Sequence, residues 1–139
     1  YVPTDGALAL MRVSRGAAFG DYDDDGDIDV LVANVNSAPT LMRNDGAEGH
    51  WVRIALKGKD SNRAGIGARV EVHSGGKVQV NEVRSGSSFL SQSDLRLHFG
   101  LAAAQAIDRV VVHWPGGAAE EYANLSIDRD LLLVQGGAK

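Results

Sequence analysis

Six aspartates crowd into one short stretch of the chain, residues 21–30, which reads DYDDDGDIDV. At every second position, Asp21, Asp23 and Asp25 are followed by Gly26 and then by Asp29, which gives the pattern D-x-D-x-D-G-x-x-D. A loop that coils around an ion presents alternate side chains to it, and Ca²⁺ takes roughly six to eight oxygens at about 2.3–2.6 Å. The spacing therefore predicts a calcium site.

The residues of this loop have different expected roles. The expected metal ligands, four through their side chains and Asp27 through its backbone carbonyl, are Asp21, Asp23, Asp25, Asp27 and Asp29. Gly26 permits the sharp bend, and Asp24, at an even position, is expected to face solvent. Ile28 and Val30 are expected to anchor the following strand in a core.

An EF-hand, a magnesium site and a solvated loop fit the acidic stretch less well. An EF-hand needs a carboxylate at its twelfth position, where this chain has Val32, and it needs flanking helices. Mg²⁺ demands a tighter octahedral shell and loses water reluctantly, so a carboxylate loop of this length favours Ca²⁺. Most acidic runs are merely solvated loops. Here the alternation, the glycine and the mutual repulsion of the carboxylates favour a bound cation.

Strands are the elements that must position this loop. Residues 30–33 form a strand-like run, and a second such run begins at residue 39. Farther along, apolar and polar residues alternate in short bursts, and Gly75–Gly76 between two of them indicates a tight hairpin. We therefore expect an all-β chain, in which a propeller-blade-like hairpin segment precedes a compact antiparallel β-sandwich or barrel. We expect residues 101–107 to form only a turn of helix or an irregular connection.

Composition excludes several classes of function. The formal charge is −4, and without the six aspartates 12 acidic residues face 14 basic ones, so the acidity is local. No Lys/Arg run is present, so we expect no binding to nucleic acid. No apolar run approaches the ~18 residues that span a bilayer, so we expect no membrane insertion. The absence of cysteine excludes a disulfide framework and thiolate chemistry. Because the chain begins with Tyr1, we expect a mature form or an excised piece.

Turn-forming residues at 44–49 mark the most plausible domain boundary, so the predicted domains are residues 1–46 and 47–139. The serine-rich segment 84–94 has no G-x-S-x-G elbow, and we expect a hydrogen-bonded loop that carries Phe89 and Leu90 inward. We expect Trp51 and Trp114 to cover the core rather than to stack on sugar rings.

Two stretches resemble known modules. The segment RGAAFGDYDDDGDIDVLVANVNSAPTLMRNDG looks like an FG-GAP or VCBS repeat, the calcium-loop blade of integrin-alpha-type propellers. From HWVRIALKG through VVVHWPGG the chain resembles the ASPIC/UnbV domain, which follows such repeats in the cartilage acidic protein family and in many bacterial exported proteins. The resemblance implies an extracellular or periplasmic setting, neighbouring propeller repeats in a longer chain, and no assigned catalytic residue. This chain has one repeat, so residues 1–46 either pack on the second domain or have lost their neighbours.

We therefore expect a calcium-binding, non-catalytic module for extracellular recognition or adhesion, whose partner is an extracellular protein or a glycan. Two alternatives stay open at this point. The first is a Ca²⁺-dependent enzyme, or part of one, acting on a small molecule in a pocket with Arg84, Ser87, Ser88 and Gln92 beside the metal loop. The second is a purely architectural cap of a β-propeller.

Overall fold

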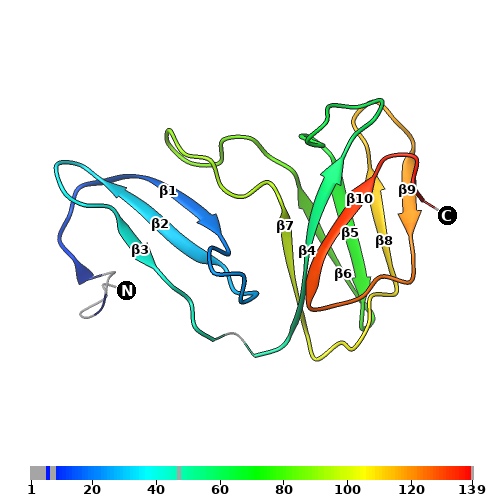
Figure 1. Cartoon of the computed structure of the whole chain (residues 1–139), viewed down its shortest axis with the longest axis horizontal. Coiled ribbons are helices and arrows are strands. Elements are labelled where there is room, and N and C mark those ends of the chain that lie inside the picture. The colour runs from blue at the N-terminus through cyan, green and yellow to red at the C-terminus, as the bar shows by residue number, and fades with distance from the viewer. Residues whose placement is uncertain (1–5, 7–8, 47, 139) are drawn as a thin grey trace. The chain divides into compact units, whose positions relative to one another are not determined.

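The computed structural model describes residues 6, 9–46 and 48–138, and ten β-strands occur in this part of the chain (Figure 1). The strands are β1 (Ser14–Gly20), β2 (Asp29–Asn34), β3 (Thr40–Met42), β4 (His50–Lys57), β5 (Arg69–Ser74), β6 (Lys77–Glu82), β7 (Leu97–Ala102), β8 (Arg109–His113), β9 (Ala119–Tyr122) and β10 (Arg129–Val134). No α-helix occurs among these described residues, and the predicted all-β class is confirmed.

The chain forms two compact units that do not follow the sequence order. The first unit comprises Tyr1–Gly46 together with Gly86–Asp94, and the second comprises Ala47–Ser85 together with Leu95–Lys139. The division into domains 1–46 and 47–139 stays a prediction, and part of it falls on residues 1–5, 7–8, 47 and 139, outside the described part. Segment 86–94, which the sequence placed in the second domain, lies with the first unit.

The first unit contains one antiparallel sheet in the order β1-β2-β3, drawn in blue to cyan in Figure 1. Ala18 pairs with Leu31, and Leu31 pairs with Leu41, so these three side chains share one face. Leu31 and Leu41 are nearly half exposed. Ile28 and Val30, which we expected in a core, are only half-buried and belong to no buried cluster among the described residues. This sheet has apolar side chains but no closed core.

The second unit contains two sheets, in the orders β10-β4-β7 and β6-β5-β8-β9. Alternate residues of both sheets form one buried apolar cluster, as the period-2 patterns predict. Its members are Val52, Ile54, Leu56, Ala68, Val70, Val72, Val83, Leu97, Phe99, Leu101, Ile107, Val110, Val112, Trp114, Tyr122 and Leu133. The arrangement is compatible with a β-sandwich, and the described strands do not close into a barrel.

The predicted antiparallel arrangement of the second domain holds for every strand pair among the described residues except one. β10 runs parallel to β4, with Arg129 opposite Val52 and Val134 opposite Lys57. The strand before it, β9, belongs to the other sheet, so the chain crosses between sheets before β10 begins, which allows the parallel direction. The β5–β6 hairpin is as predicted, since Gly75 and Gly76 have φ of 55° and 72° between the paired strand ends.

Candidate functional site

The acidic loop, defined here as residues 21–29, connects β1 to β2 and folds around the carboxylate of Asp21. That side chain is only 4% exposed. Its Oδ1 accepts the backbone N–H of Asp25 at 3.2 Å and its Oδ2 accepts that of Gly26 at 2.9 Å. Positive φ angles at Asp24 (59°) and Gly26 (99°) make the turn, which Asp and Gly tolerate better than most residues.

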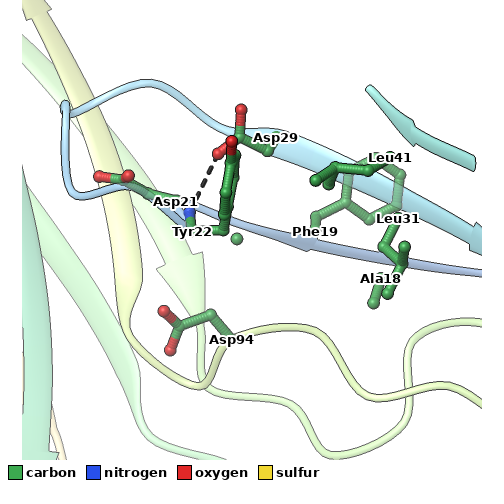
Figure 2. A pocket seen from close by; sticks show the side chains of 9 residues that line it. Ala18, Phe19, Asp21, Tyr22, Asp29, Leu31, Leu41 and Asp94 are labelled. Carbon is green, nitrogen blue, oxygen red and sulfur yellow. Dashed lines mark hydrogen bonds between the residues drawn. The ribbon is translucent and has the colours of Figure 1, made fainter. Parts of the chain in front are cut away.

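Asp29 closes the loop from its other end, at the first residue of β2. Its carboxylate is 3% exposed and accepts two backbone N–H groups, from Tyr22 at 3.0 Å and from Asn44 at 2.9 Å. The bond to Tyr22 is the dashed line in Figure 2. A buried carboxylate is costly unless it is hydrogen-bonded, so these two bonds stabilise Asp29 in this position.

Asp23 completes the central cluster. One carboxylate oxygen from each of Asp21, Asp23 and Asp29 lies within 4.8 Å of the others. The pKa of Asp23 is raised, first because the carboxylate is partly removed from water and then because Asp25 and Asp29 are negatively charged. Arg43 partly offsets this, with its guanidinium 3.6 Å from Asp23. The cluster is thus an environment that favours positive charge.

Of the five predicted ligands, the structure brings Asp21, Asp23 and Asp29 together, and Asp25 and Asp27 are outside that group of carboxylates. Oδ1 of Asp25 accepts the backbone N–H of Asp27 at 2.9 Å. Asp27 is expected to bind the ion through its backbone carbonyl, and this role stays a prediction.

An apolar pocket with a volume of about 360 Å³ adjoins the acidic loop within the first unit. Its lining is Ala18, Phe19, Gly20, Asp21, Tyr22, Asp29, Leu31, Leu41 and Asp94. Figure 2 shows Phe19, Leu31 and Leu41 gathered at one end and the carboxylates of Asp21 and Asp29 at the other. Neither this pocket nor the place of Asp94 in its wall was predicted from the sequence. The alternation of apolar residues in β1 to β3 was the available signal, but it does not distinguish a pocket wall from a core.

The serine-rich segment forms a network of hydrogen bonds within the first unit. Ser88 Oγ accepts the N–H of Ala17 at 3.1 Å, Ser87 and Ser93 hydroxyls lie 3.2 Å apart, and Gln92 Oε1 accepts the N–H of Gly86 at 3.0 Å. These groups therefore bond within the first unit. Arg84 belongs to the other unit, where it pairs with Glu82 at 3.4 Å.

The expectation that Phe89 and Leu90 point inward is wrong. Their side chains are 60% and 91% exposed. Ser88 and Ser91 form an isolated β-bridge, which leaves Phe89 and Leu90 at the apex of a tight turn with φ of 47° at Leu90. The polar groups of the segment face β1, so the apolar pair is turned outward.

The two tryptophans differ. Trp114 is 3% exposed and belongs to the core, as expected. Trp51 is half-buried, stacks on His98 with ring centroids 6.1 Å apart, and lies under the guanidinium of Arg53 at 5.8 Å.

Comparison with known proteins identifies the second part of the chain. The family model described as ASPIC and UnbV matches residues 58–139, which is more than half of the sequence. No FG-GAP or VCBS repeat is found, so that half of the resemblance stays a prediction. Among curated proteins, none matches this chain. ASPIC/UnbV modules are non-catalytic and occur in extracellular or periplasmic proteins. Within the described residues, no helix has the length and apolar character needed to cross a membrane. The match over residues 58–139 shows that this chain belongs to the ASPIC/UnbV family.

Proposed function

We propose that the chain is a calcium-binding, non-catalytic module of extracellular recognition or adhesion, in which Ca²⁺ orders the acidic loop. One observation supports this most strongly: oxygens of Asp21, Asp23 and Asp29 lie within 4.8 Å of one another, and two of these side chains are buried. Two oxygens on opposite sides of a Ca²⁺ ion lie at most about 4.6–5.2 Å apart, twice the usual bond length. The cluster therefore has the dimensions of a calcium shell.

The donor set also fits Ca²⁺. Asp29 accepts two backbone N–H groups, whereas a carboxylate has roughly four lone-pair directions. Asp29 therefore retains capacity for an ion. The ion would neutralise the negative charges that raise the pKa of Asp23. Asp21 and Asp29 would hold it from the buried side, and Asp23 from the solvent side.

Calorimetric titration of the full chain tests this proposal. We expect Ca²⁺ to bind, with an affinity that can be as weak as ~10⁻⁴–10⁻³ M and still serve outside cells, and Mg²⁺ to bind less tightly. Asp23→Asn should weaken calcium binding about tenfold or more, because it removes one charged ligand. Asp24→Asn is the matched control, since Asp24 is exposed and lies outside the cluster. Equal weakening by both variants would contradict the proposed ligand set, and absence of binding at millimolar Ca²⁺ would refute the site.

The proposed partner is an extracellular protein or a glycan. The pocket beside the loop supports a recognition role, because its apolar walls and exposed Tyr22 (56%) resemble the amphipathic surfaces that bind such partners. Screening of the chain against arrays of glycans and matrix proteins, with Ca²⁺ and with a chelator, tests this role. A calcium-dependent ligand that is lost on Tyr22→Ser supports it, and a ligand that binds equally with chelator opposes it.

A specific observation favours a second candidate, the architectural role. Of the fourteen large hydrophobic side chains that are exposed among the described residues, ten belong to the first unit. They are Leu10, Met11, Val13, Phe19, Tyr22, Leu31, Val35, Leu41, Phe89 and Leu90. All buried core residues of the described chain lie in the second unit. A sheet with apolar faces and no core of its own suits packing between neighbouring propeller repeats. Analytical ultracentrifugation of the chain, alone and mixed with separately prepared propeller repeats, tests this role, since a stable complex supports it and no association opposes it.

A further inference from the structure

The segment Gly86–Asp94, called the edge strap below, follows β6 and precedes β7 in the sequence yet lies in the first unit. β1 is an edge strand of the first sheet. Among the described residues, no strand pairs with the edge of β1 that faces away from β2. The strap covers this edge instead. Ser88 Oγ accepts the N–H of Ala17 at 3.1 Å, Ser93 Oγ accepts the N–H of Phe19 at 3.2 Å, and the N–H of Asp94 donates to the carbonyl of Phe19 at 2.9 Å.

Gly16 shows that the approach of the strap to β1 is close and specific. A Cβ atom built on Gly16 would overlap the backbone carbonyl oxygen of Phe89 and the hydroxyl of Ser91. Gly16 is not in the left-handed region, so its backbone would accept another residue. The need for glycine comes from the strap alone. Internal bonds hold the strap in shape, from Gly86 N–H to Gln92 and from Ser91 N–H to Ser88.

The strap and the acidic loop meet at the same three residues of the chain. Phe19 carries the N–H and C=O that bond the strap, Gly20 follows, and Asp21 begins the loop. A Cβ on Gly20 would lie 3.4 Å from Cβ of Asp94, so the end of the strap is in van der Waals range of this junction. An ion that fixes Asp21 also orders the neighbouring Phe19. The loss of conformational entropy that accompanies docking of the strap on Phe19 is then smaller.

We propose that calcium binding in the acidic loop and docking of the edge strap on β1 are thermodynamically coupled, an inference that rests on the calcium site proposed above. The strap presents the exposed pair Phe89 and Leu90 at its apex. Calcium thereby controls whether this apolar tip is held in one defined geometry. Coupling is reciprocal, so release of the strap weakens calcium binding by the same factor by which calcium stabilises the docked strap, typically about 5-fold to 150-fold.

Hydrogen exchange of the full chain measures the docked state directly. In the wild-type chain we expect the backbone amides of Phe19 and Asp94, together with the strap peptides, to exchange more slowly with Ca²⁺ than with chelator, by about 5-fold or more. Gly16→Val should expose these amides under both conditions and weaken calcium binding about 5-fold or more. Gly100→Val is the matched control, because Gly100 is also a strand glycine and a Cβ there meets nothing within 4 Å. It should change neither quantity.

A second variant keeps the test decisive if Gly16→Val fails to fold. The double substitution Ser88→Ala and Ser93→Ala removes two hydroxyl acceptors without adding bulk, and it should reproduce both effects in smaller size. Calorimetric binding of Ca²⁺ combined with unchanged exchange in the strap would overturn the coupling and leave the calcium site intact. Unchanged calcium affinity in a variant with a detached strap would overturn it equally. No calcium binding at all would refute the site, and the coupling with it.

Discussion

Substitution of Asp29 by asparagine is expected to destabilise the calcium-free chain and to remove most of its response to calcium. The two oxygens of this buried side chain accept the N–H groups of Tyr22 and Asn44. Asparagine keeps one oxygen acceptor but presents an N–H donor to the other backbone N–H, which is left without an acceptor. A buried N–H without a partner lowers the free energy of unfolding by about 1–3 kcal/mol. The substitution also relieves repulsion with Asp23, so we expect a net cost near the lower end, about 1 kcal/mol.

Thermal unfolding of the wild-type and Asp29→Asn chains, each with Ca²⁺ and with chelator, measures both effects. If the dissociation constant is ~10⁻⁴–10⁻³ M, about 10 mM Ca²⁺ should stabilise the wild-type chain by about 1.4–2.7 kcal/mol. The variant should gain less than about 0.5 kcal/mol, since it has lost a buried charged ligand. Asp24→Asn is the control, because asparagine tolerates the positive φ at this position as well as aspartate does. A full calcium response in Asp29→Asn would refute the assignment of Asp29 as a ligand.

Three predictions concern the second unit. Ile54→Ala should cost about 2–5 kcal/mol by chemical denaturation, because Ile54 is fully buried in the sandwich core, and a cost below about 1 kcal/mol would contradict that packing. Asp130→Asn should lower the free energy of unfolding by about 1–3 kcal/mol, because Asp130 accepts hydrogen bonds at 2.6 and 3.0 Å from the buried Arg53. The cost is limited because nearly half of the Asp130 side chain is exposed to water, which screens its charge. The bond from Arg53 lowers the pKa of Asp130 below its ordinary 3.8, so the ion pair stabilises the fold above that pH and this contribution is lost as the pH falls through the lowered pKa. Unfolding measured from neutral to strongly acidic pH should show this loss in the wild-type chain and a smaller loss in Asp130→Asn, and identical profiles would contradict it.

Local features of the fold could be predicted from the sequence because the causes are local. The turn at Gly26 and the clustering of Asp21, Asp23 and Asp29 depend on residues at most eight positions apart, and the Gly75–Gly76 hairpin depends on adjacent glycines. Period-2 alternation likewise indicated strands on both sides of Gly75–Gly76, and β5 has the alternating burial that this pattern predicts. In each case the spacing in sequence determines the spacing in space.

Features that depend on distant segments could not be predicted in this way. Periodicity identifies a strand but not its partner, so the parallel pairing of β10 with β4 was missed. The contact of Asn44 with Asp29 and the docking of the edge strap on β1 likewise join segments that no local pattern connects. Phe89 and Leu90 were expected to be buried because they are apolar. Their exposure follows from the serines that bind β1, which leave the apolar pair at the turn apex.

A crystal structure of the chain grown in calcium-rich solution tests the calcium site most directly. We predict a Ca²⁺ ion at about 2.3–2.6 Å from oxygens of Asp21, Asp23 and Asp29, with further oxygens completing a shell of roughly six to eight. Carboxylates of these three residues separated from one another, with only water between them at millimolar calcium, would contradict the proposed site.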